Sequence, residues 1–379
     1  MNVLFLDQFS DLGGAQLCLL DLLPACHERG WKTIVAAPGK GPLLKRSQAL
    51  GAAITDLSLG TYSGGWALPH NWIRFGADST ALVARIRGLI RAHRANLIYV
   101  NGPRLVPAAT VAAGSKARLI FHCHSFVPRP LASTLVAAAV RWGNVTVIAS
   151  SRFAASSLCL ASGSKDVHIV YNGVADCWRP SARIAGTWTI GLIGRIAPEK
   201  GQAVFLAAAR QVLKENLPCR FVICGEPLFG DSRGQRYLYQ LRREAGGLPV
   251  DFMGWRDDVA GVLAELDLLV VPSLDAESST RVIPEALSAR VPVVAFATGG
   301  IQEVISSECN GVLAEGLGPD ALASAILTLL RSGSDRLHAM AEQARRDWKE
   351  KFTVERYREQ VAGIMVGVPL RNRHAAARA

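Results

Sequence analysis

Short apolar runs recur along the chain, and each is followed by a polar or Gly-containing turn and a stretch with helical periodicity. Such runs are typical of strands buried on both faces of a parallel sheet, and the periodic stretches are typical of crossover helices. The alternation therefore predicts an α/β protein with doubly wound parallel sheets. The predicted strands are Val3–Asp7, Trp31–Ala37, Leu97–Asn101, Arg118–Cys123, Val145–Ser151, Thr189–Ile193, Arg220–Cys224, Val250–Trp255, Leu268–Val271 and Val291–Ala295.

The alternation is interrupted around Trp178–Gly186 and starts afresh at Thr189. A chain of 379 residues exceeds the size at which a single core usually stops growing. We therefore expect two domains of similar size, 1–178 and 179–352.

The most informative stretch is Leu268–Ala295, which carries Glu277 and Glu285 with seven residues between them. Pro284 lacks a backbone N–H and fits only the first turn of a helix, so a helix should begin near residues 280–281. Glu277 then lies on the loop after a parallel strand, Glu285 lies about one turn into the helix, and helix-start N–H groups lie between them. Such a helix start attracts an anion, although the helix dipole alone would also favour an acid there.

A cationic string, GRIAPEKG, lies between the strand Thr189–Ile193 and a predicted helix, Gln202–Glu215. It places Arg195 at the carboxyl end of a strand and Lys200 at the amino end of a helix, where the helix dipole disfavours positive charge. This electrostatic cost argues for a phosphate ligand. The alternative is a pair of solvated loop charges.

Gly13 and Gly14 lie in the turn between the first strand and a predicted helix, Ala15–Arg29. Paired glycines let a backbone approach a ligand at a helix start, although a tight turn can require them for steric reasons alone. The spacing is not the G-x-G-x-x-G of a dinucleotide site.

Two histidines close the strand Arg118–Cys123, namely His122 and, just beyond it, His124. Alternation places them on the same side of the strand. Open α/β sheets bind ligands at the carboxyl ends of their strands, so both are candidate site residues, with a structural hydrogen-bonding role as the alternative. Lys40 follows an earlier strand and is a further candidate.

The net charge of +11 lies almost wholly in the first half of the chain. Residues 1–180 carry 18 Lys and Arg against 8 Asp and Glu, whereas residues 181–379 carry 24 against 23. One domain therefore suits an anionic partner, such as a membrane surface, a phosphorylated lipid or nucleic acid, and charge alone does not choose among these.

A predicted amphipathic helix, Asp78–Arg94, places Arg87, Arg91 and Arg94 on one face. This face is either an ordinary solvated surface or a contact with a membrane or an acceptor. The preceding segment, 60–76, reads as a Gly-rich loop with four aromatic residues, which are unfavourable to expose without a purpose. They are Tyr62, Trp66, Trp72 and Phe75.

Together these motifs resemble family 4 of the retaining glycosyltransferases with the GT-B fold. The resemblance rests on the E-x7-E pair in its PS…PEAL…PVVA frame and on G-R-x4-K-G, and it spans residues 3 to about 360. It implies two Rossmann-like domains with an interdomain cleft, the acceptor on the first and the nucleotide sugar on the second. It also implies that a last helix within 353–368 crosses back to the first domain, which leaves 369–379 as a disordered basic tail.

The same resemblance assigns roles to the charged residues. Glu277 would contact the donor sugar and Glu285 the ribose hydroxyls, while Arg195 and Lys200 hold the diphosphate. His124 matches the active-site histidine of the family better than its neighbour does. These assignments place the reaction at the carboxyl ends of the strands.

The resemblance also assigns positions that supply backbone or smaller contacts. Residues 278–280 depart from the family, which usually has a Gly-aromatic-Gly step there. The further donor-side positions are Gly13, Gly14, Ser278, Ser279, Thr280, Arg281 and Val282, and the acceptor-side positions are Gln16, Lys40 and His122.

The activity implied is sugar transfer with retention from a UDP- or GDP-linked sugar, without a cofactor or a divalent metal. A sugar-nucleotide epimerase or a phosphorylase with the same fold is the nearest alternative. A basic protein that binds nucleic acid is the alternative from another class, but the chain has no RNP, helix-turn-helix or zinc signature, and its basic half lacks the phosphate motifs.

The chain start, MNVLFLDQF, has no basic segment before its apolar run, and no apolar stretch reaches the length of a membrane span. The eight cysteines show no C-x-x-C spacing. We therefore expect a cytoplasmic protein, peripheral on the inner face of the membrane, that acts on a lipid-linked or otherwise anionic acceptor.

Overall fold

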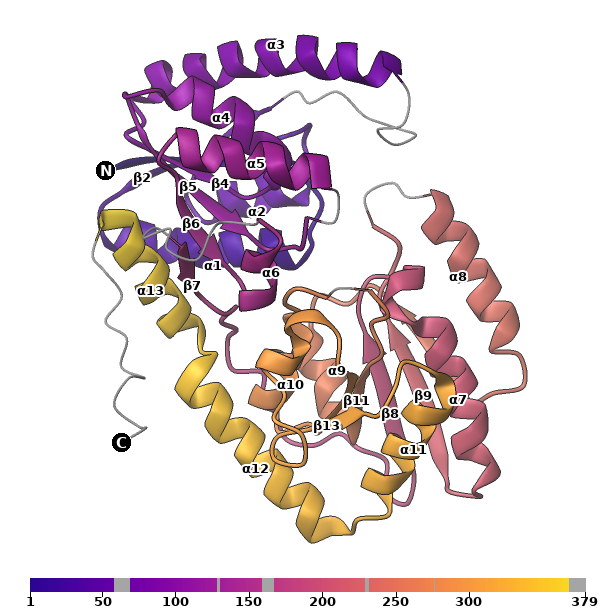
Figure 1. Cartoon of the computed structure of the whole chain (residues 1–379). Coiled ribbons are helices and arrows are strands. Elements are labelled where there is room, and N and C mark those ends of the chain that lie inside the picture. Colours follow the sequence, from indigo (N-terminus) through magenta and orange to yellow (C-terminus); the bar gives the residue numbers. More distant parts are fainter. Residues whose placement is uncertain (58–68, 128–129, 159–166, 229–231, 276, 368–379) are drawn as a thin grey trace. The chain divides into compact units, whose positions relative to one another are not determined.

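The computed structural model describes the chain except for residues 58–68, 128–129, 159–166, 229–231, 276 and 368–379, and side chains are not described for 69–79 and 130–131 either. The described residues form two compact units. The first holds Met1–Val170 and the C-terminal residues from Tyr357 on, and the second holds Tyr171–Arg356. Each unit is built on one parallel sheet (Figure 1).

The first unit has a seven-stranded sheet in the order β3-β2-β1-β4-β5-β6-β7. The chain winds outward from β1 to one edge, returns to place β4 beside β1, and winds outward to the other edge. The strands are β1 Asn2–Leu6, β2 Lys32–Ala37, β3 Ala53–Asp56, β4 Leu97–Val100, β5 Arg118–Cys123, β6 Thr146–Ala149 and β7 Val167–Ile169. The helices are α1 Gly14–Glu28, α2 Pro42–Ala49, α3 Pro69–His93, η1 Pro103–Leu105, α4 Val106–Ala113, α5 Pro130–Trp142 and α6 Arg152–Ser156.

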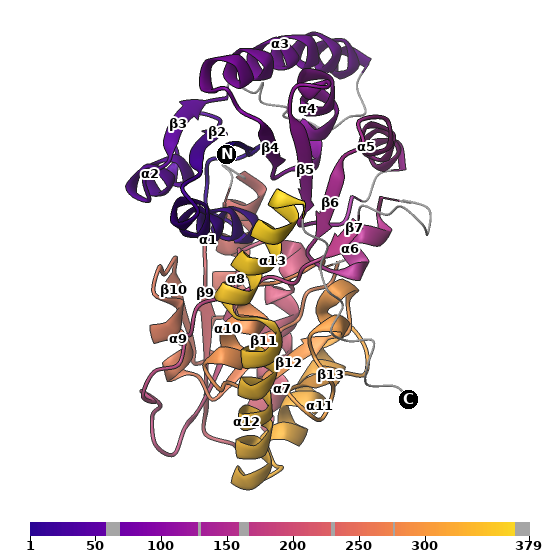
Figure 2. The ribbon, with the colours of Figure 1, turned by 90° about the vertical axis from the view of Figure 1, so that its left-hand side faces the viewer.

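Helices cover both faces of this sheet (Figure 2). The core on one face holds side chains of α3, α4, α5 and α6, and the core on the other holds side chains of α1, α2 and the C-terminal helix α13, Val354–Val366. Along β1, Leu4 belongs to the first core and Phe5 to the second, and both are fully buried. A strand covered on both sides needs apolar residues at every position, which explains its unbroken apolar run.

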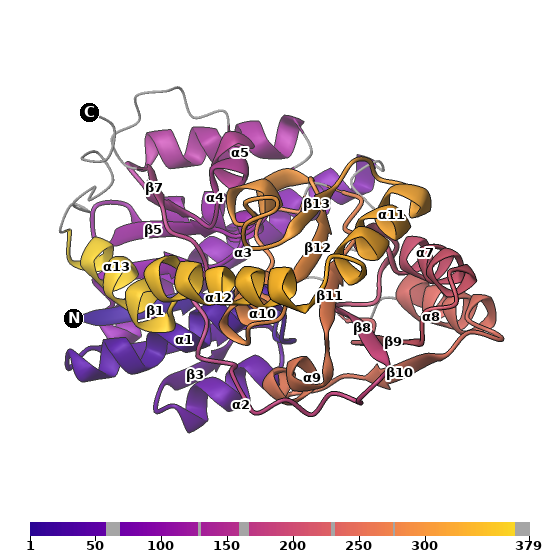
Figure 3. The same ribbon diagram turned by 90° about the horizontal axis from the view of Figure 1, so that it is seen from below.

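The second unit repeats this plan with six strands in the order β10-β9-β8-β11-β12-β13. The strands are β8 Trp188–Ile193, β9 Cys219–Cys224, β10 Val250–Gly254, β11 Leu268–Val271, β12 Val293–Phe296 and β13 Val312–Ala314. The helices are η2 Pro198–Lys200, α7 Gln202–Lys214, α8 Ser232–Glu244, α9 Val259–Glu265, α10 Val282–Ser288, η3 Gly299–Glu303, α11 Pro319–Leu330 and α12 Ser334–Lys351. Side chains of α7, α8 and α11 pack on one face and those of α9 and α10 on the other, and Figure 3 shows α7 and α8 side by side.

The prediction of doubly wound parallel sheets is confirmed. The predicted strands Arg118–Cys123 and Leu268–Val271 have the same bounds as β5 and β11. The helix expected to begin near residues 280–281 begins at Val282.

The prediction that 60–76 is a loop is wrong from Pro69 onward, because α3 begins there rather than at Asp78. Proline has no N–H to lose in a first turn and has a backbone angle suited to it, so it starts this helix. Tyr62 and Trp66 lie outside the described residues, as do the side chains of Trp72 and Phe75.

The chain returns from the second unit to the first within α13. Tyr357 Oη donates a hydrogen bond to the Cys18 carbonyl at 3.2 Å, and Arg358 Nε donates one to the Asp21 carbonyl at 2.6 Å. Both contacts tie α13 to α1. Within the part of the chain that the structure describes, no helix is long and apolar enough to cross a bilayer.

Candidate active site

In the second unit, the candidate residues lie after β8 and β11, on the loops that follow these strands and on the start of α10. The two strands are neighbours in the sheet, and the strand order reverses between them. Ligands of open α/β sheets bind at such a reversal, outside the carboxyl ends of the strands. Arg195 and Lys200 follow β8, and Glu277 follows β11.

Two glycines let these loops pack backbone against backbone. Gly201 has φ +75°, and a Cβ on it would lie 2.0 Å from the Pro272 carbonyl oxygen. Gly299 has φ +53°, and a Cβ there would lie 2.2 Å from the Glu277 carbonyl oxygen, which also accepts a 2.8 Å hydrogen bond from Gly300 N–H. Only glycine combines this backbone angle with this close approach. The backbone of Glu277 is therefore held in place by its contacts with Gly299 and Gly300.

Lys200 and Glu277 form an ion pair across the reversal point. Ser273 Oγ donates a second hydrogen bond to the Glu277 carboxylate at 3.2 Å. The side chains of Lys200 and Glu277 are 24% and 13% exposed, so the pair is shielded but can still be reached from solvent. An anionic ligand arriving here would have to compete with Glu277 for the Lys200 ammonium.

Arg195 is balanced in the same way. Its Nη2 lies 2.5 Å from Glu199 Oε1, and its carbonyl accepts a 2.8 Å hydrogen bond from Gln202 Nε2. The positive charge of Arg195 at the end of β8 is thus offset locally by Glu199. Sequence reasoning missed this residue, although the P-E-K string places an acid four residues from the arginine.

Glu285 belongs to a separate cluster. Its carboxylate lies 3.7 Å from Arg281 Nε, and Arg281 Nη1 donates a 3.3 Å hydrogen bond to the Gly173 carbonyl. Ser279 Oγ accepts a 3.0 Å hydrogen bond from Asn172 Nδ2. The structure therefore pairs Glu277 with the β8 loop and Glu285 with the residues just after β7.

The remaining donor-side candidates lie between these two glutamates. Ser278 is buried, and Thr280 is partly buried in the loop before α10. Arg281 caps the helix, and Val282 is its first residue.

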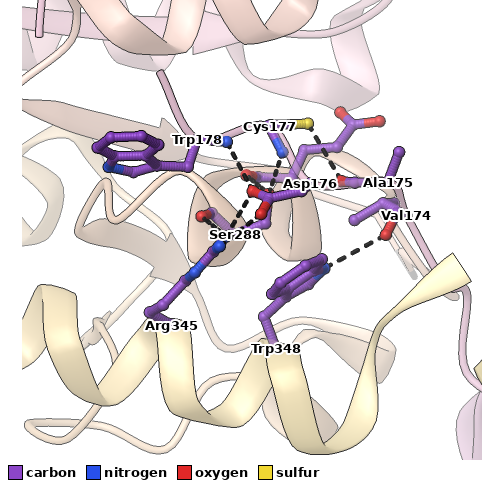
Figure 4. A network of polar contacts seen from close by, with 9 residues as sticks. Val174, Ala175, Asp176, Cys177, Trp178, Ser288, Arg345 and Trp348 are labelled. Atoms are coloured by element: carbon purple, nitrogen blue, oxygen red, sulfur yellow. Dashed lines mark hydrogen bonds and ion pairs between the residues drawn. The ribbon is translucent and has the colours of Figure 1, made fainter. Parts of the chain in front are cut away.

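A polar network joins α10 to α12 and to the segment before β8 (Figure 4). Arg345 of α12 contacts both carboxylate oxygens of Asp176 at 2.5 Å, also donates to the Ser288 carbonyl, and lies 4.4 Å from the Trp348 ring centroid. Cys177 N–H donates to Ser288 Oγ at 3.0 Å. The segment before β8 is thereby held against the helix that carries Glu285.

In the first unit, the strand order reverses between β1 and β4, and a polar residue follows each strand. Asp7 follows β1 and Asn101 follows β4. Asp7 is fully buried and accepts hydrogen bonds from Asn101 Nδ2 at 2.6 Å, from Gln16 Nε2 at 2.9 Å and from Phe9 N–H at 2.9 Å. Burial raises the pKa of Asp7 to about 6, against the opposing effect of these hydrogen bonds.

The Gly13–Gly14 turn is attached to this network. Gly13 precedes α1, and its N–H donates a 3.1 Å hydrogen bond to Gln16 Oε1. Gln16 itself is buried and directs its amide nitrogen to Asp7. Gln16 therefore links the predicted glycine turn to a carboxylate that sequence reasoning did not single out.

The two histidines lie on the same side of the chain, as predicted, with ring centroids 3.7 Å apart. His122 is buried and its Nδ1 lies 2.5 Å from Tyr99 Oη, whereas His124 is partly buried and its Nε2 lies 2.8 Å from Asn101 Oδ1. Burial, with the neighbouring ring, holds the pKa of His122 well below its usual range. Lys40 is exposed on the loop after β2.

Solved structures of similar shape define the class as GT-B. The chain matches Anabaena HepE, solved in complex with UDP and glucose, with a TM-score of 0.79 over 97% of this chain and 100% of that one, at 23% identity. It matches sucrose-phosphate synthase from Thermosynechococcus elongatus with a TM-score of 0.77 over 96% and 98%, at 18% identity. Likeness at these identities establishes the fold.

Family models then define the family. Residues 12–176 match the model of glycosyltransferase family 4, and residues 187–332 match that of glycosyl transferases group 1. The chain belongs to family 4 of the glycosyltransferases.

Similar sequences include two kinds of inositol glycosyltransferase. The chain is 29% identical to the phosphatidyl-myo-inositol mannosyltransferase of Mycobacterium leprae, over 89% of this chain and 90% of that one. It is 33% identical to the D-inositol 3-phosphate glycosyltransferase of Corynebacterium urealyticum, over 45% of this chain and 42% of that one. The chain therefore matches less than half the length of the Corynebacterium urealyticum enzyme. It matches 35% of the length of the D-inositol 3-phosphate glycosyltransferase of Corynebacterium kroppenstedtii.

Proposed function

We propose that this protein transfers a sugar, with retention at the anomeric carbon, from a UDP- or GDP-linked donor to an acceptor that is lipid-linked or otherwise anionic. The observation that carries the proposal is the pair of cations, Arg195 and Lys200, at the strand-order reversal of the second unit. Family membership and the relatives named above support the reaction class.

The leaving nucleoside diphosphate gains negative charge as its bond to the sugar breaks. Cations held in place beforehand stabilise that charge more than they stabilise the ground state, which lowers the barrier. Because Lys200 and Arg195 are paired with Glu277 and Glu199, the diphosphate would compete with these carboxylates. Lys200 then turns to the phosphate, and Glu277 becomes available to sugar hydroxyls.

The remaining donor contacts follow the family pattern. Glu285 binds the ribose hydroxyls, and the backbone of residues 278–282 binds the diphosphate. UDP is the first nucleotide to test, because HepE was solved with UDP-glucose.

The first unit supplies the acceptor side. His124 contacts the reacting groups, the Gly13–Gly14 turn approaches the donor diphosphate, and Gln16, His122 and Lys40 belong to the acceptor side. In the predicted division, the acceptor therefore belongs to residues 1–178 and the nucleotide-sugar donor to residues 179–352.

An anionic acceptor or membrane is supported by the basic surface of the first unit. Arg87, Arg91 and Lys116 line a pocket of about 360 Å³ at the end of α4, and Arg87 donates a 3.1 Å hydrogen bond to the Val111 carbonyl. Each Lys or Arg near an anionic surface contributes roughly 1 kcal/mol before salt screening. The protein would work at the cytoplasmic face of a membrane without crossing it.

The reaction class is tested by incubating the protein with a panel of UDP- and GDP-linked sugars and measuring slow donor hydrolysis. We expect hydrolysis of one donor by the wild type and slower hydrolysis of the same donor by Lys200→Ala. Rearrangement of the donor sugar without hydrolysis or transfer would instead make the protein an epimerase, and no turnover of any donor would contradict the proposal.

The membrane is tested separately by liposome co-sedimentation. Binding should require anionic lipid, weaken with salt as the Debye length falls below about 10 Å, and fall in Arg87→Gln/Arg91→Gln/Arg94→Gln. Exposed Arg210, Arg242 and Arg243 of the second unit provide a control triple variant with the same change of charge. If liposome binding does not depend on salt, or if the protein does not bind liposomes, the membrane part of the proposal is wrong and the acceptor is a soluble molecule.

A further inference from the structure

Asp7 is a fully buried carboxylate at the strand-order reversal of the first unit, and it contacts two side-chain amides at once. Asn101 Nδ2 lies 2.6 Å from Asp7 Oδ2, and Gln16 Nε2 lies 2.9 Å from Asp7 Oδ1. An ionised carboxylate only accepts hydrogen bonds, so each amide must present its NH2 group to Asp7. The carbonyl end of each amide is thereby directed to the other side.

The carbonyl ends are the parts that reach the candidate site. Asn101 Oδ1 lies 2.8 Å from His124 Nε2, and Gln16 Oε1 lies 3.1 Å from the Gly13 nitrogen. An amide oxygen cannot donate, so the partner nitrogen of His124 must carry a proton. In the neutral ring, Nδ1 then holds the lone pair.

We propose that Asp7 is a positioning residue that sets the polarity of two amides, and through them fixes the Nε2–H tautomer of His124 and holds the Gly13–Gly14 turn. The proposal deepens the function proposed above, since it assumes that His124 contacts the reacting groups. One carboxylate thus orients both parts of the first unit that are expected to meet the donor and the acceptor.

The burial of this group agrees with an orienting role. The partners described for Asp7 are amides and backbone N–H groups, and burial raises its pKa to about 6, so that it is ionised at neutral pH. A buried carboxylate stabilised only by neutral donors is costly for the fold. It nevertheless gives each of its neighbours one allowed orientation.

The decisive variant is Asp7→Asn, which has the same shape. If the amide oxygen takes the Oδ1 position, to accept from Phe9 N–H and Gln16, the new NH2 group meets the NH2 group of Asn101. Asn101 must then rotate by half a turn and present its own NH2 to His124. The ring would be forced to accept at Nε2 and to carry its proton on Nδ1.

The tautomer can be read directly from histidine ¹⁵N chemical shifts in the full-length protein, with His124→Gln to assign the signal. We expect Nε2–H in the wild type and Nδ1–H in Asp7→Asn. Transfer should fall on the order of 10²- to 10⁴-fold in kcat, the range known for loss of acid–base groups and for wrong histidine tautomers. The donor KM should change little.

A matched control is available in the second unit. Asp347 is also buried, and accepts hydrogen bonds from an asparagine, Asn310 Nδ2 at 2.8 Å, and a glutamine, Gln343 Nε2 at 3.1 Å. Asp347→Asn should cost stability but leave the His124 tautomer and kcat unchanged. It therefore separates general damage to a buried network from the proposed effect.

An Nδ1–H tautomer in the wild type, or an unchanged tautomer in Asp7→Asn, would overturn the proposal, even if activity falls. If Asp7→Asn does not fold, Asn101→Ala tests the same link, and we expect His124 to show both tautomers in exchange, whereas retention of pure Nε2–H would overturn the proposal. The tautomer is measured without substrate. A wild type with Nε2–H that turns over no nucleotide sugar would therefore contradict the proposed function and not the link from Asp7 to His124.

Discussion

The two units place polar groups at the same topological position but use them in opposite ways. At the β8/β11 reversal, Lys200 and Arg195 are partly exposed cations, each balanced by a carboxylate. At the β1/β4 reversal, Asp7 is a fully buried anion surrounded by neutral donors. A partly exposed ion pair can exchange one partner for a phosphate, whereas a buried network can hold a ring in a single orientation. The comparison suggests that the second unit binds charge and the first unit orients groups.

Within the second unit, the largest effect should come from removing the Lys200 charge. Lys200→Ala should lower the transfer rate on the order of 10- to 1000-fold, as for loss of one charge-stabilising group. The measurement is kcat/KM for the donor that the hydrolysis panel identifies. Arg331→Ala, which breaks the exposed Arg331–Glu215 ion pair in the same unit, is the control and should leave activity intact. If folded Lys200→Ala has unchanged kinetics, the assignment of diphosphate binding to Lys200 is wrong.

The next effect concerns the buried anion and its dependence on pH. The pKa of Asp7 rises from 3.8 to about 6 on folding, so the folded protein holds an extra proton between these values. The stability that this proton contributes is present below about pH 4 and is lost as pH rises through about 6, a change of about 3 kcal/mol. The difference in free energy of unfolding between wild type and Asp7→Asn should fall by that amount over this range.

Among the described residues, three other ionisable side chains are linked to Asp7 through Asn101. His124 contacts Asn101, His122 lies beside His124, and Tyr99 contacts His122. Taking the difference between the two proteins removes their contribution where it is shared. If this difference in free energy of unfolding stays constant with pH, Asp7 has the same pKa in the folded and the unfolded protein. The contrast between a buried anion in the first unit and exposed ion pairs in the second would then be lost.

A smaller effect distinguishes the two glutamates of the second unit. Glu285→Gln should weaken binding of the free nucleoside diphosphate by about tenfold, as for loss of the charge on a group that accepts a hydrogen bond. Glu277→Gln should leave that affinity unchanged or raise it, because Glu277 competes for Lys200. Calorimetry measures both. If the Glu277 variant binds more weakly than the Glu285 variant, the two roles are exchanged or wrong.

Much of this arrangement follows from local patterns. The apolar runs give the strands, the residues just after them are the candidate groups, and the period of two places His122 and His124 together. The contacts that join distant residues do not follow. Asn101 meets Asp7 because β4 pairs with β1 and not with β3, and strand order is a property of the whole sheet.

Similar reasons explain the other misses. Glu199 reaches Arg195 only because a 3-10 turn brings the loop back, which charge spacing alone does not specify. The short strands β3, β7 and β13 lack the long apolar runs of the central strands; β3 and β7 lie at the edges of the first sheet, and β13 at one edge of the second. Their placement depends on the neighbouring strand that they pair with.

The smallest effect tests whether the second unit also contains a purely structural ion pair. Asp176 is half exposed, and the Arg345 guanidinium bonded to it lowers the pKa of its carboxyl group. Asp176→Asn should reduce the free energy of unfolding by at most about 1 kcal/mol, the usual range for an exposed pair, because Arg345 keeps the Ser288 carbonyl and the Trp348 ring.

A lowered pKa sets the direction of its pH dependence. The contribution of Asp176 is present above the unfolded pKa and is lost as pH falls through the lower folded value, so wild type and variant should converge in acid. Chemical denaturation at neutral and acidic pH measures this, and nucleoside diphosphate affinity should not change in the folded variant. A loss of affinity comparable to that of Glu285→Gln would mean that the Arg345 network positions α10 for the ligand, and the second unit would then orient groups as the first does.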